Sequence, residues 1–232
     1  DPLRALRAVR FASCLFGYHP KHSSDPMMDA LKGLRAVHFT WTKPFDFKIE
    51  AETEKAIREL VQLQREQKLP LPAWERIQEE LGKILLSERA GFGFKTLDDL
   101  GMLELYLPEL PEGRGVSQGS LHHLDVLQHG FEALRQLIGY FPDADVALRW
   151  GTLLHDVGKP RTKQETDGLS FHGHAEVGAE IVGKMLSRLR YSADITERVK
   201  NLVKYHMIPL PHKRSDADDA QHARANHIWI EL

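Results

Sequence analysis

Several residues in the second half of the chain have the types and the placement needed to hold a metal ion. Most of them open or close predicted helices, and the pair His155–Asp156 ends the apolar run "LLHD" shortly before Gly158. Burying an imidazole or a carboxylate is costly unless a hydrogen bond, an opposite charge or a metal ion satisfies it. The candidate ligands are His122, Asp125 or His129 on the first predicted helix of this region, together with His155, Asp156, His174 and His206. We therefore expect a divalent cation held by nitrogen and oxygen atoms.

The helical periodicity around these residues would turn several of them to one side. Residues 122–139 carry an apolar stripe, and His122, Asp125 and His129 share the opposite face. Successive residues of a helix differ by about 100°. A histidine and an aspartate that are adjacent in sequence therefore reach one ion most easily where their helix ends, as 143–156 is expected to do.

The third and fourth helices of this region place their histidines differently. His174 opens the stretch 174–190, and His206 lies on the apolar stripe of 194–206, three residues after Val203. Helical bundles build metal sites from inward-facing side chains on several helices. The four stretches together therefore favour a metal centre.

Each residue also has a simpler interpretation. A single histidine on an apolar face is more often a core residue than a ligand, and the polar face of 122–139 is equally consistent with a solvated surface. The single cysteine, Cys14, excludes a thiolate-rich site. Imidazole and carboxylate ligands suit Mn, Fe, Co, Ni or Zn, and Mg where carboxylate and water dominate. One or two ions are expected, and Asp156 could bridge two.

The surrounding elements predict an all-α protein. No stretch shows the alternation of polar and apolar residues that strands require. The predicted helices are 3–16, 50–66, 73–86, 122–139, 143–156, 174–190 and 194–206. The proline- and glycine-rich stretch "LPELPEGRGVSQGS" indicates a boundary between a helical neck and body, residues 1–117, and a helical bundle, residues 118–232.

Composition excludes an integral membrane protein and gives no general attraction to nucleic acid. The 232 residues carry a net charge of -2, and the apolar runs are only a few residues long, whereas a spanning helix needs about 20. One cysteine suits a reducing cytoplasm. Arg4, Arg7 and Arg10 form a basic stripe on the first helix that would contact RNA phosphates or be solvated. The opening "DPLRALRAVR" lacks the apolar core of a signal peptide and suggests a piece of a longer protein.

Four motifs in the second half resemble a known family. They are "HHLDVLQHG", "LLHDVGKP", "FHGHAEVGAEI" and "LRYSADITERVKNLVKYHM". In this order they resemble the HD-domain superfamily of metal-dependent phosphohydrolases, in the form fused to bacterial CCA-adding tRNA nucleotidyltransferases and poly(A) polymerase-like proteins. The segments "DPLRALRAVRFAS", "ERIQEELGKILLS" and "LDDLGMLELYLPEL" are similar to the neck and body of those enzymes. Relative to the family, about 16–45 looks inserted.

The resemblance assigns roles by position. It places the family's first metal-binding histidine on His129, the HD pair on His155 and Asp156, and further ligands of the binuclear forms on His174 and His206. Asp125, with His122 nearby, would orient His129. The family's final aspartate has no clear match, which leaves the number of ions open.

A hydrolytic function makes His155, Asp156 and Lys159 the residues nearest the chemistry. A divalent ion lowers the pKa of water, so that hydroxide can attack phosphorus near pH 7. Lys159 would contact the substrate phosphate, or else it is a cation stabilised at a helix C-terminus. The resemblance implies 2′,3′-cyclic phosphodiesters, 2′-nucleotides, other phosphomonoesters or an RNA 3′ end as substrates.

A non-catalytic RNA-binding body is the alternative. It would bind tRNA, partly through the arginine stripe, as a portion of a CCA- or A-adding enzyme whose head is separate or absent. That head should supply a glycine-rich turn and paired aspartates on a strand. The motif "DAD" occurs at 143–145 and 216–218, but at expected helix starts or loops. We do not expect CCA addition from this chain alone, and a separate head or a second copy of the chain are possible partners.

Overall fold

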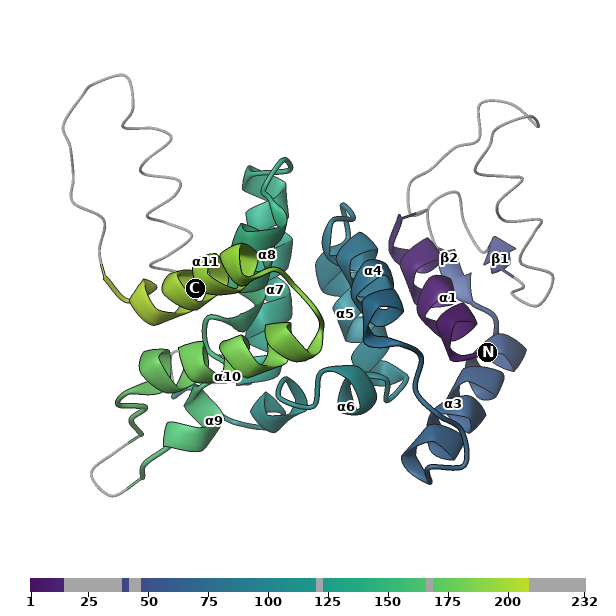
Figure 1. Ribbon diagram of the computed structural model, residues 1–232, viewed down its shortest axis with the longest axis horizontal. Coiled ribbons are helices and arrows are strands. Elements are labelled where there is room, and N and C mark those ends of the chain that lie inside the picture. The colour runs from purple at the N-terminus through teal and green to yellow at the C-terminus, as the bar shows by residue number, and fades with distance from the viewer. Residues whose placement is uncertain (15–38, 42–46, 120–122, 166–168, 209–232) are drawn as a thin grey trace.

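The computed structural model describes residues 1–14, 39–41, 47–119, 123–165 and 169–208, and this part of the chain is predominantly helical (Figure 1). The first half contains α1 (Pro2–Cys14), β1 (Phe39–Trp41), β2 (Phe47–Ile49), α3 (Ala51–Arg65), α4 (Trp74–Leu85), α5 (Ala90–Asp99), α6 (Leu103–Tyr106) and the 3-10 helix η1 (Pro111–Gly113). The second half contains α7 (Val126–Tyr140), α8 (Val146–Leu154), α9 (Lys159–Thr162), α10 (His174–Arg188) and α11 (Ala193–Tyr205). The all-α prediction is confirmed.

One small sheet adds to the predicted helices. The strands β1 and β2 pair antiparallel, with Phe39 opposite Ile49 and Trp41 opposite Phe47. Both strands are only three residues long, too short to leave an alternation that periodicity could detect. Most of the predicted insertion, about 16–45, lies outside the described residues.

The start predicted for the helix 122–139 is wrong. The helix α7 begins at Val126, because Asp125 has an extended backbone and its side chain accepts a hydrogen bond from the Gln128 backbone N–H. An aspartate in this position satisfies one of the N–H groups that a helix start leaves unpaired. Asp125 is therefore not part of the helical face on which it was expected beside His129, and His122 lies outside the described residues.

A second aspartate begins α8 in the same way. The Asp145 side chain accepts a hydrogen bond from the Leu148 backbone N–H at 2.9 Å. This confirms the interpretation of the first "DAD", residues 143–145, as carboxylates at a helix start. The second, residues 216–218, lies outside the part that the structure describes.

Most of the buried apolar side chains that the structure describes form one connected core. In the first half α1 packs on α4 and α5, and in the second half α7 and α11 pack on α8 while α10 packs on α11. The halves join where α5 contacts α7 and α4 contacts α8. Phe94 and Trp150, both fully buried, meet at this junction with ring centroids 5.6 Å apart. Because the two halves share this core, the predicted domain boundary between residues 117 and 118 stays a proposal.

A buried arginine also holds this junction. Arg149 on α8 is 4% exposed, and its guanidinium donates to the backbone oxygens of Leu85 and Ser87 at 2.9 Å each. It also donates to the oxygens of Ala144 at 2.9 Å and Pro142 at 2.5 Å. The carbonyl groups at the end of α4 have no helical partner and carry partial negative charge, so a cation suits them. Arg149 thereby ties α8 to the C-terminal end of α4.

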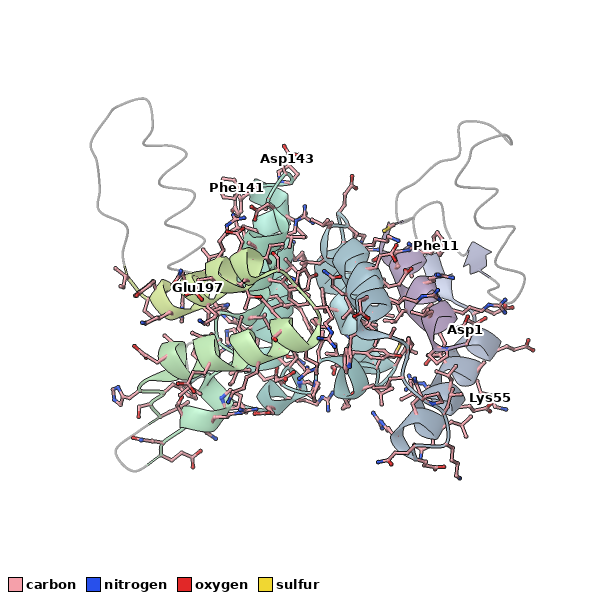
Figure 2. The ribbon with its side chains drawn as sticks, in the orientation of Figure 1. Asp1, Phe11, Lys55, Phe141, Asp143 and Glu197 are labelled. Atoms are coloured by element: carbon pink, nitrogen blue, oxygen red, sulfur yellow. The ribbon has the colours of Figure 1, made fainter. Side chains whose placement is uncertain are left out.

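Charged side chains cover the outside of the helices, and Asp143 and Phe141 lie at the tip between α7 and α8 (Figure 2). Among the described helices, none is long and apolar enough to cross a membrane.

Candidate metal centre

Four helices meet at the predicted ligands, and the structure brings together all five side chains that the resemblance assigned as ligands. His129 lies near the start of α7, and His155 caps the C-terminal end of α8 with Asp156 directly after it. His174 is the first residue of α10, and His206 caps the end of α11. The helix end at Leu154 lets two adjacent residues face one centre, as the sequence predicted.

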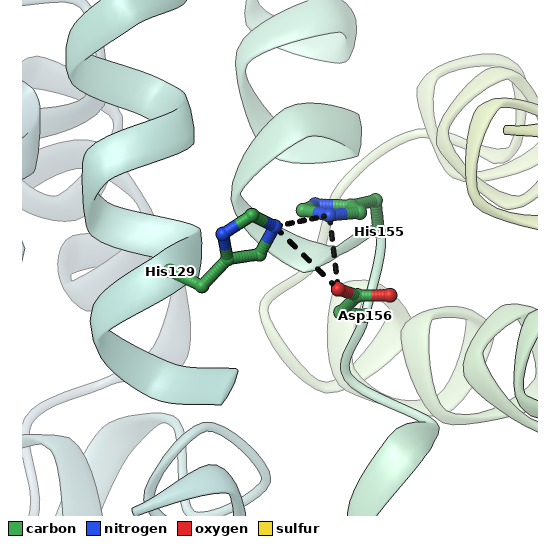
Figure 3. Close-up of side chains that lie close together, drawn as sticks. All are labelled: His129, His155 and Asp156. Carbon is green, nitrogen blue, oxygen red and sulfur yellow. Dashed lines mark hydrogen bonds and ion pairs between the residues drawn. The ribbon is translucent and has the colours of Figure 1, made fainter. Parts of the chain in front are cut away.

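The first group of ligand atoms comes from His129, His155 and Asp156, all buried (Figure 3). The two histidine Nε2 atoms lie 3.2 Å apart. The Oδ2 atom of Asp156 lies 3.1 Å from the Nε2 of His155 and 3.7 Å from that of His129. These three side chains can bind one ion.

The second group comes from Asp156, His174 and His206. The Nε2 atoms of the two histidines lie 3.2 Å apart. They lie 3.5 Å and 3.7 Å from Oδ1 of Asp156. Each carboxylate oxygen of Asp156 therefore faces its own pair of histidines, which is the arrangement needed for a carboxylate that bridges two ions.

Backbone carbonyl groups fix the orientation of three of the rings. Nδ1 of His155 lies 2.8 Å from the Thr152 oxygen, and Nδ1 of His174 lies 2.8 Å from the Phe171 oxygen. Nδ1 of His206 is 2.7 Å from the oxygen of Val203. A carbonyl oxygen only accepts, so each Nδ1 carries the proton and donates it. In a neutral ring the Nε2 lone pair then points at the cluster, which is the tautomer that metal-binding histidines adopt.

The cluster is electrostatically suited to a cation. Burial alone would raise the pKa of Asp156, but His155 and Lys159 outweigh it and hold that pKa well below its usual range. Burial lowers the pKa of His155, but the Asp156 carboxylate and the Thr152 carbonyl together raise it, and the net shift is upward. Burial lowers the pKa of His206 to about 4. At neutral pH the centre thus offers an ionised carboxylate and, at His206, an unprotonated imidazole.

The spacing of the Nε2 atoms of His174 and His206 shows that these residues fit a metal ion. His174 and His206 both donate through Nδ1, so neutral rings direct two lone pairs at each other across 3.2 Å. A cation between them removes this repulsion. Nitrogens bound to one ion at about 2.0–2.1 Å would have this separation at an angle near 100°. The donor set, imidazole and carboxylate without thiolate, fits a divalent ion of the predicted type.

Lys159 belongs to the centre through an ion pair. Its Nζ lies 2.7 Å from Oδ2 of Asp156 and 2.7 Å from Oε1 of Gln118. The helix α8 has already ended at Leu154, so the interpretation of Lys159 as a cation at a helix C-terminus is not supported. Contact between Lys159 and a substrate phosphate stays a prediction.

Asp125 has a structural role that the sequence also signals. One carboxylate oxygen accepts from the Gln128 backbone N–H and the other from the Gly115 backbone N–H, each at 2.8 Å. An aspartate directly before an apolar helical run is a recognisable start signal. Its predicted role in orienting His129 stays a prediction.

Two members of the arginine stripe pair with a buried carboxylate. The side chains of Arg7 and Arg10 lie 3.2 Å and 3.3 Å from the carboxylate oxygens of Glu80 on α4, which is 3% exposed. Arg4 is exposed. Periodicity along α1 gives no sign of Glu80, because the partner lies on a distant helix. A contact between these arginines and RNA stays a prediction; Arg4 is exposed, and the Arg7 side chain is still 41% exposed despite its pairing with Glu80.

Gly158 lets α10 approach the centre. A Cβ atom at this position would lie 2.1 Å from the backbone oxygen of His174 and 2.7 Å from the nitrogen of Gly178. Gly158→Ala must therefore push α10 away, and we expect it to lower the free energy of unfolding by about 1–3 kcal/mol. Because His174 moves with α10, Mn²⁺ should also bind more weakly. Urea unfolding and titration calorimetry measure the two effects.

Gly139→Ala is the matched control. It changes a glycine of α7 whose Cβ would meet nothing within 4 Å, so alanine should be neutral or stabilising by up to about 1 kcal/mol. Wild-type stability and Mn²⁺ affinity in Gly158→Ala would show that the close approach is not required.

Comparison with known families agrees with this geometry. Residues 121–228 match the HD domain. The second half of the chain therefore contains an HD domain. Residues 46–112 match a second family described as the probable RNA and SrmB-binding site of polymerase A, and this match precedes the HD domain.

Curated relatives cover both segments. The A-adding tRNA nucleotidyltransferase of Deinococcus radiodurans is 48% identical over 207 residues, which are 88% of this chain and 46% of that protein. The CC-adding tRNA nucleotidyltransferase of Thermus thermophilus is 39% identical over 198 residues, 84% of this chain and 45% of that protein. The Multifunctional CCA protein of Verminephrobacter eiseniae is 31% identical over 179 residues, 77% of this chain and 42% of that protein. The HD-domain chain thus spans less than half the length of these relatives, and its resemblance to this group is confirmed.

Proposed function

We propose that the HD domain of this chain is a metal-dependent phosphohydrolase that acts on nucleotide or RNA-end phosphates. The observation that carries this proposal is the double use of Asp156, whose two oxygens each face a pair of histidines. Several kinds of core packing could bury one histidine. Lys159 already pairs with one oxygen of this carboxylate, but the two pairs of histidine Nε2 atoms that face each other at 3.2 Å are best satisfied by bound cations, and phosphate hydrolysis is a reaction that such a centre serves.

The protein's own residues would bind and orient the substrate. When bound, a divalent cation withdraws charge from phosphoryl oxygens and makes water acidic enough to lose a proton near neutral pH. His129, His155 and Asp156 would hold one ion, and Asp156, His174 and His206 a second. The carbonyl partners of His155, His174 and His206 keep these rings in place. Lys159 would donate a hydrogen bond to a phosphoryl oxygen from its third N–H.

RNA-end substrates are supported by the neighbouring segment. The match to an RNA-binding family ends at residue 112, and the match to the HD domain begins at residue 121. The relatives are named for activities on tRNA. We therefore propose 2′,3′-cyclic phosphodiesters, 2′-phosphates or phosphomonoesters of nucleotides and RNA 3′ ends as the substrate class.

Metal removal and replacement test the phosphohydrolase proposal. The purified chain is chelated, and Mg, Mn, Co, Ni and Zn are added back separately with 2′,3′-cyclic AMP and with an RNA ending in a 2′,3′-cyclic phosphate. We expect hydrolysis only after a metal is restored. Background rates with every metal, in protein that binds the ion by calorimetry, would contradict the proposal.

A tRNA-binding portion of an A- or CCA-adding enzyme is the second candidate. The match of residues 46–112 to an RNA-binding family and the named relatives favour it. Binding that depends on phosphate contacts should weaken steeply as salt rises, with a slope that falls by about one for each contact removed. Tight, salt-sensitive tRNA binding by a chain that hydrolyses nothing would make this the better account.

A further inference from the structure

We propose that Gln118 is a positioning residue for Lys159. The segment that joins the RNA-binding part to the HD bundle would then orient the Lys159 ammonium group beside the metal centre. The inference rests on the proposed function, because it gives Lys159 its task. It concerns residues 111–118, here called the connector, which lie between α6 and α7.

The Lys159 ammonium is held from several sides. Asp156 Oδ2 and Gln118 Oε1 each lie 2.7 Å from its Nζ, and the Phe171 ring centroid lies 5.5 Å away. The side chain is only 15% exposed. An ammonium has three N–H donors, and the two acceptors use two of them. The direction of the third is thereby fixed by Asp156 and Gln118 together.

The connector is itself anchored on both sides of the centre. Arg161 of α9 donates to both carboxylate oxygens of Glu112, at 2.7 Å and 2.6 Å. The Gly115 N–H donates to Asp125 at the start of α7, and the Val126 N–H donates to the Val116 oxygen at 3.1 Å. Gln118 therefore reaches Lys159 from a segment fixed to both α7 and α9.

The chemistry of Gln118 suits positioning. An amide oxygen is a neutral acceptor, so it directs the ammonium without cancelling its positive charge. Asp156 already balances one charge at Lys159. A carboxylate at position 118 would keep the hydrogen bond but add a second negative charge, which would repel an anionic phosphate. Gln118→Glu and Gln118→Ala thus separate charge from hydrogen bonding.

A double-mutant cycle tests the inference in the full chain. We expect Gln118→Ala to lower kcat/KM for 2′,3′-cyclic AMP about tenfold, as loss of a hydrogen bond to a charged group would. Gln118→Glu should act mainly by raising KM. Because Gln118 acts through Lys159, the variant Gln118→Ala with Lys159→Ala should be no slower than Lys159→Ala alone. If Gln118→Ala lowers kcat/KM as much in the Lys159→Ala background as it does in the wild type, the inference is overturned.

A labelling experiment keeps the test independent of activity. The rate at which an amine-reactive acylating reagent modifies Lys159, followed by mass spectrometry, should rise severalfold in Gln118→Ala. Gln136→Leu removes an amide bonded to Glu132 on α7. It should change neither the rate at which Lys159 is labelled nor the rate of hydrolysis. Unchanged labelling of Lys159 in Gln118→Ala would refute the positioning role. Faster labelling in a chain that hydrolyses nothing would retain the contact and reject the phosphohydrolase proposal.

Discussion

Asp156→Asn should reduce hydrolysis to background and weaken divalent metal binding by more than about a hundredfold. Loss of a residue that only supports a ligand costs up to about a hundredfold in affinity, and Asp156 belongs to both groups of ligand atoms. Asparagine has nearly the same shape but no negative charge to balance a cation. Calorimetric titration with Mn²⁺ and the rate with 2′,3′-cyclic AMP measure the two losses, and circular dichroism checks that the helices are retained.

Two other variants calibrate this result. His206→Ala removes a ligand from only the second group, so it should lower the number of bound Mn²⁺ ions from two to one. Asp143→Asn changes an exposed carboxylate at the tip between α7 and α8 (Figure 2) and should behave like the wild type. Mn²⁺ affinity that stays within a few-fold of the wild type in Asp156→Asn would show that the cluster is not a metal centre.

Arg149→Met should lower the free energy of unfolding by about 3 kcal/mol, because methionine cannot satisfy the carbonyl groups that the guanidinium bonds. Leu85 is fully buried and Ser87 is 8% exposed, so water cannot easily replace the lost donors. For a chain of this size the change corresponds to a decrease in Tm of roughly 6–12 °C. Urea unfolding and calorimetry measure it.

The charge and the hydrogen bonds of Arg149 can be separated. Arg149→Lys keeps the charge, but its three N–H donors cannot span four carbonyl groups, so the loss of stability should be intermediate. Arg135→Met removes an arginine side chain that is 68% exposed, and its effect should stay within about 0.5 kcal/mol. A similar, small effect of Arg149→Met and Arg135→Met would rule out Arg149 as a tie between the two halves.

Local sequence signals determined much of the helical framework. The apolar periodicity of 174–190 and 194–206 predicts α10 and α11 to within two residues at each end. Such patterns work because they record which face of one helix is buried. They misplaced the start of α7, because a capping aspartate fits the same periodicity as a helical residue and only its extended backbone shows the difference.

The candidate ligands could also be chosen from the sequence. Their arrangement into two groups around Asp156 could not. The types of residue and their places at helix ends singled out His155, Asp156, His174 and His206, and the family resemblance selected His129 on the first helix. Only the tertiary structure decided that Oδ2 of Asp156 faces one pair of histidines and Oδ1 the other. The ring orientations depend in turn on backbone carbonyl groups, which every residue has and which therefore leave no trace in the sequence.

The partners of the charged side chains could also be identified only from the tertiary structure. Arg7 bonds Glu80, 73 residues away, Gln118 bonds Lys159 across 41 residues, and Arg149 bonds Leu85 across 64. Periodicity relates residues within one helix, where neighbours are three or four positions apart. Contacts between helices depend on how those helices pack. The sequence alone therefore predicts helices and a set of ligands, whereas the packing of α4, α8 and the connector decides which charges are paired and which can meet a substrate.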